Sequence, residues 1–326
     1  SGLRPADLLP VMLDTLLYWL ARLLVGVLQA LPLGLVARVG RWGGAMAYRL
    51  DGRHRRVALE NLRQCFGGEW TGEQIREMAR ENFRRLGENY CSAIKTAAMS
   101  DEELEGRIET LGLERLRARI REEPVSSVMF AIGHFGNFEL YARAGRHLPG
   151  FRFGTTYRGL RQKGLDRLLK RLRERSGCVF FERRTEGGAL RAALSAQRLT
   201  LGLLVDQHAG ARGIQVPFFG RECSTSPAPA LLALRYRLPL FTAYCFRTAI
   251  GRWRFEVGEE IATRLDGKSR PIEDIMTDVN RSFEAAIRRD PANWFWVHKR
   301  WKAPRPAADK REAQAPSDQV EDPSHG

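Results

Sequence analysis

The stretch FAIGHFGNFEL, residues 130–140, runs from an apolar segment directly into a histidine, a glycine, an asparagine and a glutamate. A helix cannot bring the two ionisable side chains of this stretch together, because His134 and Glu139 would lie about 140° apart around its axis. A buried strand over residues 128–132, followed by a sharp glycine turn, removes this difficulty. We therefore predict a strand, a turn and a helix that begins near Asn137.

Strands and helices alternate on both sides of this turn. The predicted strands cover residues 125–132, 151–157, 178–181, 200–205, 238–246 and 253–257. The predicted helices cover residues 53–64, 71–98, 113–122, 160–175, 188–197, 229–235 and 272–289. Such alternation is typical of α/β proteins. We predict a mixed, largely parallel sheet flanked by helices.

Residues 1–50 are predicted to form hydrophobic helices that associate with a membrane. Between residues 8 and 39 the only charged side chains are Asp14, Arg22 and Arg38. This segment is longer than the apolar part of a signal peptide and lacks a small-residue cleavage site. A charge inside a membrane span costs about 2.5–3.5 kcal/mol, so a span, an in-plane anchor and a buried core helix all stay open. The arginines that follow would keep the body of a spanning protein in the cytoplasm.

Residues 51–302 are predicted to form the α/β domain, and residues 303–326 a disordered tail. The tail consists of proline, alanine and charged residues without hydrophobic periodicity, a composition that cannot form a packed core. The whole chain of 326 residues is 44% hydrophobic, which is enough for a substantial core in the remaining part.

The chain is strongly basic, with 53 Lys and Arg against 38 Asp and Glu and a formal net charge of +15. Such a protein favours an anionic partner, which could be nucleic acid, an anionic membrane surface, or an acidic protein or phosphorylated substrate. The five cysteines have no CxxC spacing and the six histidines are isolated. We therefore expect neither a disulfide framework nor a metal site.

His134 and Glu139 are predicted to lie in the crevice at the carboxyl end of the strand, where open α/β sheets bind ligands. A carboxylate that accepts one ring N–H fixes the tautomer of a histidine and leaves the other nitrogen able to take a proton from a hydroxyl. The chain has no GxSxG, Walker, GxGxxG or HExxH motif, so a covalent serine route lacks its signature. The opposing interpretation is that Asn137 caps a helix and His134 is an ordinary loop histidine.

Further polar side chains follow other predicted strands. TTYR (155–158) ends one strand with an arginine, and LLVDQHAG (203–210) ends another with an aspartate and a glutamine. VPFFG (216–220) precedes STSPAPALLALRY, and NWFWVHKRWK (293–302) interleaves aromatic and basic side chains. Polar groups from several strand ends that meet in one crevice are what a catalytic site requires.

Taken in order, these motifs resemble the lipid A biosynthesis late acyltransferases, the lauroyl and myristoyl transferases of the lysophospholipid acyltransferase-like superfamily. The resemblance runs from the N-terminal apolar segment through His-x4-Glu, Tyr-Arg, Asp-Gln and Pro-Phe-Phe-Gly to the aromatic and basic stretch near the C-terminus. It covers roughly residues 10–306, and several motifs in a fixed order are far more specific than any one of them.

The resemblance implies that a fatty acyl chain moves from an acyl carrier protein thioester to a hydroxyl of a phosphorylated glycolipid, at the cytoplasmic side of the bacterial inner membrane. It implies no cofactor, no metal and no nucleic-acid partner. His134 would be the general base, Glu139 its orienting partner, and Arg158 a group that stabilises oxyanion charge or a phosphate. The remaining candidate substrate-binding residues are Asn137, Tyr157, Arg183, Arg184, Asp206, Gln207 and Thr225.

Several alternatives stay open from the residues alone. The acceptor could be another lipid, such as a lysophospholipid or a mannoside glycolipid, and the donor could be coenzyme A. The basic helix over residues 163–175 is either a docking face for an acidic carrier protein or a solvated surface. His298 is either a second site histidine or a packed structural one. A basic membrane-binding or nucleic-acid-binding protein without enzymatic activity is the non-enzyme alternative, although no nucleic-acid motif is present.

Overall fold

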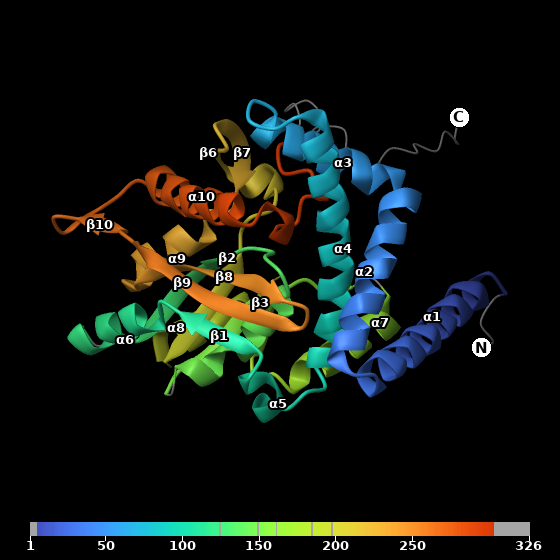
Figure 1. The fold of residues 1–326 in the computed structure, drawn as a ribbon. Coiled ribbons are helices and arrows are strands. Elements are labelled where there is room, and N and C mark those ends of the chain that lie inside the picture. The colour runs from blue at the N-terminus through green and yellow to red at the C-terminus, as the bar shows by residue number, and fades with distance from the viewer. Residues whose placement is uncertain are drawn as a thin grey trace, which may run out of the picture.

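The computed structural model describes residues 5–302, apart from residues 124, 149, 161, 184 and 197. The tail predicted for residues 303–326 lies outside this range. A seven-stranded sheet in the order β1-β9-β8-β2-β5-β3-β4 forms the centre of the chain (Figure 1). All neighbouring strands are parallel except β8 and β9, which are antiparallel. The strands are β1 (Ile108–Leu111), β2 (Ser127–Ile132), β3 (Arg152–Tyr157), β4 (Val179–Glu182), β5 (Leu199–Leu204), β8 (Leu240–Ala249) and β9 (Arg252–Ile261).

The central strand β2 is buried along its whole length. Its side chains alternate between two hydrophobic clusters, with Met129 and Ala131 in one and Phe130 and Ile132 in the other. Each cluster fills one face of the sheet, since successive side chains of a strand point to opposite faces. A strand covered on both faces has no solvent-exposed side, which explains why its sequence is apolar throughout after the buried Ser127.

Helices cover both faces of the sheet. The helices α3 (Gly52–Phe66), α4 (Gly72–Thr96), α8 (Gly187–Ala196), α9 (Ala228–Tyr236) and α10 (Ile272–Arg289) contribute to the cluster that contains Met129. Helix α6 (Leu113–Glu122) and the 3-10 helix η1 (Phe138–His147) contribute to the cluster that contains Phe130. The short helix α5 (Asp101–Glu105) adds one buried leucine to the second cluster.

Helix α2 (Leu33–Leu50) crosses α4 at very short range. A Cβ atom at Gly40 or Gly44 would collide with the backbone of Gly87 or Phe83 on α4. The buried carboxylate of Glu88 on α4 pairs with Arg41 and Arg247, which ties α2 and α4 to β8. The glycines permit the close approach, and α2 is packed onto the α/β part.

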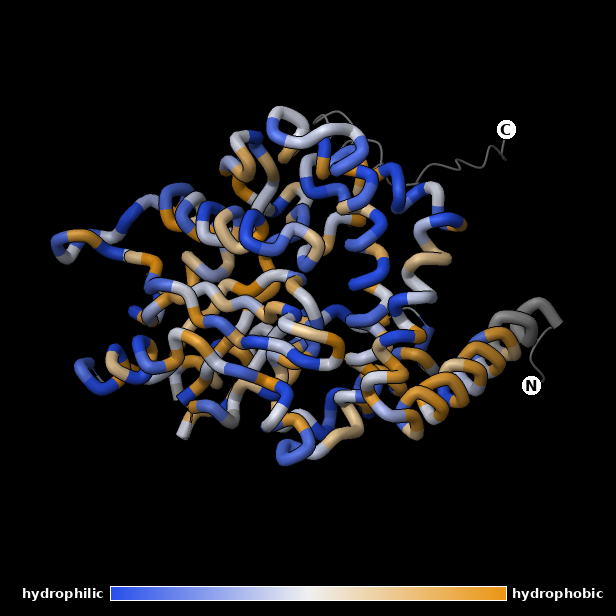
Figure 2. The backbone as a smooth tube through the Cα atoms, in the orientation of Figure 1, coloured by the Kyte–Doolittle hydropathy of each residue, from blue (hydrophilic) through white to orange (hydrophobic). Residues whose placement is uncertain are grey.

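Helix α1 (Pro5–Ala30) extends away from the other helices and is apolar along most of its length (Figures 1 and 2). Residues 12–30 are long and apolar enough to cross a membrane. The helix contacts helix α7 (Lys163–Glu174), where Asp14 accepts from the Gly164 backbone N–H at 3.3 Å and the Tyr18 hydroxyl accepts from Arg171 at 3.2 Å. Its C-terminal end contacts α4, where the Gln29 side chain donates to the Ile94 carbonyl at 3.2 Å. Most of its described apolar side chains are exposed, which makes α1 a candidate membrane anchor.

The predicted fold class is confirmed, and every predicted strand and helix from residue 53 to residue 289 is present with boundaries shifted by a few residues. The helix expected near Asn137 is the 3-10 helix η1. The edge strand β1, helix α5 and the hairpin of β6 (Ile214–Phe218) and β7 (Arg221–Thr225) were not predicted from the sequence. Neither were the two-residue strands β10 (Arg264–Leu265) and β11 (Lys268–Ser269) or the short 3-10 helices η2 (Gly210–Arg212) and η3 (Pro291–Asn293). Strand β1 has only four residues, of which three are exposed, so it lacks the apolar run that marks the other strands.

Candidate active site

His134 and Asp206 meet at the carboxyl edge of the sheet. They follow β2 and β5, which are neighbouring parallel strands, so both chain segments leave the sheet at the same edge. The Nδ1 atom of His134 lies 2.8 Å from Oδ1 of Asp206, and the His134 backbone N–H donates to Oδ2 of the same carboxylate at 2.7 Å. Asp206 is completely buried, while the His134 side chain keeps 15% of its surface exposed.

The Asp206 carboxylate is charged in spite of its burial. Burial alone would raise its pKa, but the nearby His134 ring, the His134 backbone N–H and the indole N–H of Trp294 together hold the pKa below its ordinary value. An ionised carboxylate at Nδ1 keeps the proton of a neutral imidazole on that nitrogen. The Nε2 atom then carries a lone pair, and it lies 3.4 Å from the Gln207 amide nitrogen. The His134–Asp206 pair therefore has the arrangement that a general base needs to take a proton from a hydroxyl.

The turn that presents His134 is fixed by backbone contacts. Gly136 has a positive φ of 53°, and a Cβ atom there would collide with the Cys245 carbonyl. The Gly136 N–H donates to the Asn293 carbonyl at 2.9 Å, and Phe135, fully buried, forms an isolated bridge with Trp294. Only glycine adopts this conformation without strain in so little space, in agreement with the sharp glycine turn predicted after the strand.

The expected pairing of Glu139 with His134 is wrong, because Glu139 pairs with Arg173 of α7. The Arg173 guanidinium donates to both carboxylate oxygens, at 3.0 Å and 2.6 Å. A two-point contact of this kind occupies the carboxylate, and the position at His134 Nδ1 is taken by Asp206. Glu139 still lies beside His134, since both line a small cavity with Asn89, Asn137 and other side chains. A catalytic role of Glu139 stays a prediction.

Two arginines lie at the ends of β3 and β4. Arg158, which follows β3, is exposed. Arg183, which follows β4, donates from Nε to the Thr156 hydroxyl at 3.1 Å. Arg158 and Arg183 directly follow Tyr157 and Glu182, which are paired residues of the parallel strands β3 and β4, so the two arginines lie near each other. Arg184 lies outside the described residues.

The other candidates are less accessible. Asn137 is buried and donates to the Thr96 hydroxyl at 3.4 Å. Tyr157 is half-buried, with the Lys170 ammonium 5.7 Å from its ring centroid. Thr225 is completely buried, and its hydroxyl accepts from Arg300 at 2.6 Å. The Thr225 hydroxyl is therefore hydrogen-bonded to another side chain and has no exposed surface. Its expected substrate-binding role stays a prediction.

Trp294 is a site residue that was not predicted from the sequence. Its indole nitrogen donates to Asp206 Oδ2 at 2.8 Å, although the two residues are 88 positions apart. The available signal was the run of tryptophans near the C-terminus, because buried indole groups need a hydrogen-bond acceptor. Within the residues that the structure describes, no cluster of three or more His, Cys, Asp or Glu is placed to hold a metal ion.

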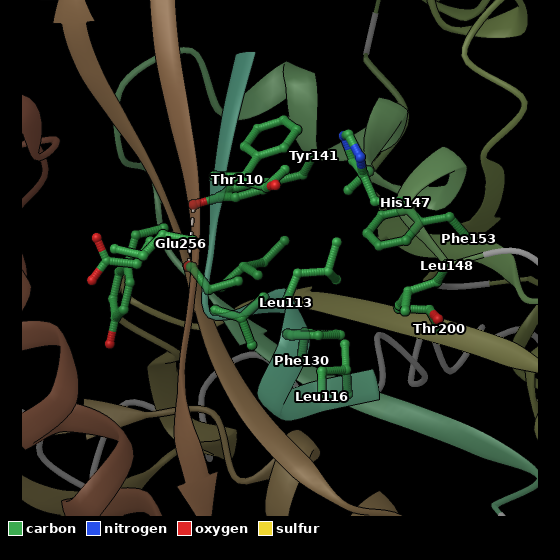
Figure 3. Close-up of a pocket in the computed structure, with 17 residues that line it drawn as sticks. Thr110, Leu113, Leu116, Phe130, Tyr141, His147, Leu148, Phe153, Thr200 and Glu256 are labelled. Atoms are coloured by element: carbon green, nitrogen blue, oxygen red, sulfur yellow. Dashed lines mark hydrogen bonds between the residues drawn. The ribbon is translucent and has the colours of Figure 1, made fainter. Parts of the chain in front are cut away.

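Apolar cavities extend from the site along one face of the sheet. The cavity beside His134 shares Phe138 and Glu139 with a second cavity that reaches Tyr157 and Leu204. The second cavity shares Ile132, Tyr141 and Phe153 with a third, almost purely apolar one (Figure 3). In Figure 3 side chains from β2, β3, α6 and η1 surround this third cavity, among them Phe130, Phe153, Leu113 and Leu148. Glu139 also lines a cavity of about 320 Å³ between α4 and α7, which shares Tyr90 and Ala93 with the cavity beside His134.

A His–Asp pair at the edge of a largely parallel α/β sheet, with apolar cavities beside it, is the arrangement of an α/β enzyme that combines a candidate general base with room for an apolar ligand. Helix α1 is a candidate membrane anchor. Residues 9–303 match the model of the bacterial lipid A biosynthesis acyltransferase family. The chain belongs to this family and is an acyltransferase.

Curated relatives agree with this assignment. The chain is 26% identical over 294 residues to the lipid A biosynthesis lauroyltransferase of Escherichia coli K12, a match that covers 87% of this chain and 92% of the relative. The lipid A biosynthesis palmitoleoyltransferase of the same organism and a lipid A biosynthesis acyltransferase of Shigella flexneri are each 26% identical over 293 residues, with the same coverage. The family resemblance stated from the motifs is thereby confirmed.

Proposed function

We propose that the protein transfers a fatty acyl chain from an acyl carrier protein thioester to a hydroxyl of a phosphorylated glycolipid, a precursor of lipid A, with His134 as general base. The single observation that carries this proposal is the His134–Asp206 pair at the rim of apolar cavities. We place the reaction at the cytoplasmic side of the bacterial inner membrane. The exposed apolar helix α1, the basic charge of the chain and the family support this location.

The transfer would proceed in one displacement. His134 Nε2 takes the proton of the acceptor hydroxyl while the hydroxyl oxygen attacks the thioester carbonyl carbon. The carbonyl oxygen gains negative charge, the carbon–sulfur bond breaks, and the leaving thiolate takes up the proton that His134 holds, which returns the imidazole to its neutral form. Asp206 stabilises the imidazolium that forms in between, because its ionised carboxylate lies 2.8 Å from Nδ1. No enzyme acyl intermediate is needed.

Two arginines at the edge of the sheet can bind the other negative charges of the reaction, the phosphate and the oxyanion. Arg158 and Arg183 lie near each other at the carboxyl edge of the sheet. A pair of guanidinium groups binds phosphate or a developing oxyanion well, since each offers several donors in a fixed plane. We assign them to a phosphate of the acceptor or to the oxyanion of the transition state. The acyl chain would lie in the apolar cavities along β2, with its end between α6 and the sheet.

The proposal is tested with the full-length protein in detergent micelles. Wild type, His134→Ala and Asp206→Asn are each given labelled acyl carrier protein or acyl-coenzyme A, together with one acceptor. The acceptors are a phosphorylated glycolipid, its dephosphorylated form, a lysophospholipid and a mannoside glycolipid. We expect transfer to the phosphorylated glycolipid from the carrier protein, and a loss of roughly 10²- to 10⁴-fold in His134→Ala.

Each alternative has its own outcome in this assay. Equal rates with the dephosphorylated acceptor would show that the enzyme does not recognise the phosphate. Faster transfer from acyl-coenzyme A than from the acyl carrier protein would show that the proposed donor is wrong. Transfer only to the lysophospholipid or to the mannoside glycolipid would show that the proposed acceptor is wrong. Near-normal turnover by His134→Ala would refute the general-base mechanism itself.

A further inference from the structure

The segment after α10 contacts the turn after β5 at three consecutive positions. This C-terminal segment, residues 293–302, lies against the turn formed by residues 206–208. The contacts pair Trp294 with Asp206, Arg300 with Gln207, and His298 with His208. The same segment also holds the turn of His134, through the Gly136 N–H that donates to the Asn293 carbonyl. Both halves of the His–Asp pair are thus attached to one piece of chain.

We propose that Trp294 and His298 are positioning residues of the acyl transfer: the Trp294 indole N–H fixes the plane of the Asp206 carboxylate, and the His298 ring fixes the backbone of the turn that carries it. This inference rests on the proposed function of His134 and Asp206. It adds residues that touch neither substrate nor reacting atoms. Their effect would be transmitted through Asp206 alone.

The carboxylate of Asp206 needs such fixing. Rotation about its terminal bond is soft, because a torsion between an sp³ and an sp² carbon has no sharp minima. Oδ2 accepts two hydrogen bonds, from the His134 backbone N–H at 2.7 Å and from Trp294 Nε1 at 2.8 Å. These two donors fix the plane and leave Oδ1 for the His134 ring. Trp294 and Asp206 are 2% and 1% exposed, so water cannot replace a lost donor.

Trp294 is itself held rigidly. Its carbonyl accepts from the Asn82 side chain at 2.6 Å, and its ring meets Trp296 edge-on at a centroid distance of 4.7 Å. Phe218 packs edge-on against it as well, at 5.6 Å. A donor that is fixed in this way can fix its acceptor in turn.

His298 acts on the backbone. Its Nε2 atom accepts from the His208 N–H at 3.0 Å, which requires that this nitrogen carries no proton. Burial is the largest of the effects that lower the pKa of His298 to about 4. The ring therefore stays neutral, and the hydrogen bond persists, at neutral pH. Arg300, completely buried, donates to the Gln207 carbonyl at 3.4 Å and to the Ser224 carbonyl at 2.6 Å, and this completes the attachment of the turn.

The test compares two tryptophans of the same segment in the carrier-protein assay. Trp294→Phe removes the donor to Asp206 but keeps an aromatic ring. Trp296→Phe is the matched control: Trp296 is equally buried, its indole donates to the Pro291 carbonyl at 2.7 Å and not to Asp206, and phenylalanine keeps an aromatic ring beside Trp294. We expect Trp294→Phe to lower kcat roughly 10- to 100-fold with little change in KM. We expect Trp296→Phe to keep kcat near the wild-type value.

The pH profile separates a positioning role from simple destabilisation. A carboxylate that has lost a donor is more basic and stabilises the imidazolium more strongly. The acidic limb of the kcat/KM profile should therefore move upward in Trp294→Phe by roughly 0.5–1 unit, and not in Trp296→Phe. The other titratable groups that face Asp206 are Tyr141, His298 and Arg300, and both variants leave them in place.

His298 provides a second pair of variants that does not disturb the tryptophans. Gln at this position can offer an acceptor where Nε2 lies, whereas Leu cannot. We expect His298→Leu to lose about tenfold in kcat and His298→Gln to recover most of it. His134→Ala, run in parallel, reports on the proposed function separately. Identical kcat values and pH profiles for the two tryptophan variants, or equal activities of the two His298 variants, would overturn the inference while leaving the His134 result unaffected.

Discussion

The Glu139–Arg173 ion pair connects η1 to α7 at the rim of the site. Both side chains line the cavity between α4 and α7 and the neighbouring cavity that reaches Tyr157. We expect Glu139→Gln and Arg173→Gln each to lower activity, and the double variant to be no worse than the weaker single one, because both remove the same contact. Steady-state rates of the three variants and wild type form the double-mutant cycle that measures this.

A direct action of Glu139 on His134 predicts a different result. In that case Arg173→Gln would stay close to wild-type activity while Glu139→Gln would not, and the two effects would add. The matched control is Arg171→Gln on the same helix, because Arg171 contacts Tyr18 of α1 and is not among the residues that line these cavities. It should leave turnover in detergent unchanged.

Asp206 makes the stability of the protein depend on pH. Its pKa in the folded protein is lowered by the His134 ring, the His134 backbone N–H and the Trp294 indole, against the opposing effect of burial. A lowered pKa means that this stabilisation is present above the pKa of an unfolded aspartate, about 3.9, and is lost as the pH falls through the folded value. Urea unfolding of wild type and Asp206→Asn between pH 7 and pH 3 measures the difference. The gap in unfolding free energy should narrow below a pH of about 4, and a gap that stays constant would contradict this account.

The partner of His134 could not be predicted from local sequence. Spacing within residues 130–140 placed the histidine correctly, since the apolar run and the glycines are local signals. Glu139 is five positions away, whereas Asp206 is 72 positions away and reaches His134 only because β5 pairs with β2. Strand order is decided by the packing of the whole sheet, which no short window of sequence contains. The Trp294 contact depends in the same way on where the chain returns after α10.

The helices and strands themselves were more accessible to prediction, because hydrophobic periodicity is a local property. Strand β2 and helix α10 match their predicted ranges closely, since one is apolar throughout and the other has a strong apolar stripe. The hairpin of β6 and β7 was missed, because each strand has only five residues, β6 contains a glutamine and a proline, and β7 begins with two charged side chains. Its turn carries Phe219 at a positive φ of 52°, which sequence alone does not reveal.

Helix α6 is expected to help set acyl-chain length. Its first residue, Leu113, lines the apolar cavity opposite β2 (Figure 3). Leu113→Ala removes three carbons and leaves space for roughly as many methylene groups, so the preferred acyl chain should become longer. Competition between acyl carrier proteins of graded chain length measures this preference. Leu238→Ala is the matched control, because Leu238 is equally buried but belongs to the cluster on the other face.

The outcome also decides between two cavities. A shift with Leu113→Ala but not with Leu238→Ala places the acyl chain along β2. An unchanged preference, combined with a shift on Leu172→Ala, would place the chain instead in the cavity of about 320 Å³ between α4 and α7. Each of these alanine variants loses side-chain volume and can therefore lower the stability of the protein. Thermal unfolding curves should accompany the competition assay to measure that loss.

We expect membrane attachment to depend on the exposed face of α1. Leu16, Leu20 and Leu24 follow one another at four-residue spacing on this helix and are 57%, 54% and 56% exposed. Burial of a leucine side chain contributes about 1.5–3 kcal/mol. Replacing all three with glutamine should therefore weaken partitioning into phospholipid vesicles by roughly a thousandfold or more. Turnover of a detergent-solubilised acceptor should persist, because none of the three lines the cavities around His134.

The comparison needs a variant with the same change in composition. Leu111, Leu231 and Leu265 are 48%, 47% and 60% exposed and lie outside the N-terminal helices. Their replacement by glutamine should leave vesicle binding close to wild type, measured by flotation with vesicles that contain anionic phospholipid. High salt would weaken the contribution of the basic surface in both variants but not that of the apolar helix. A triple α1 variant that still floats with vesicles at high salt would mean that another surface holds the protein on the membrane, and α1 would then be only a packing partner of α7.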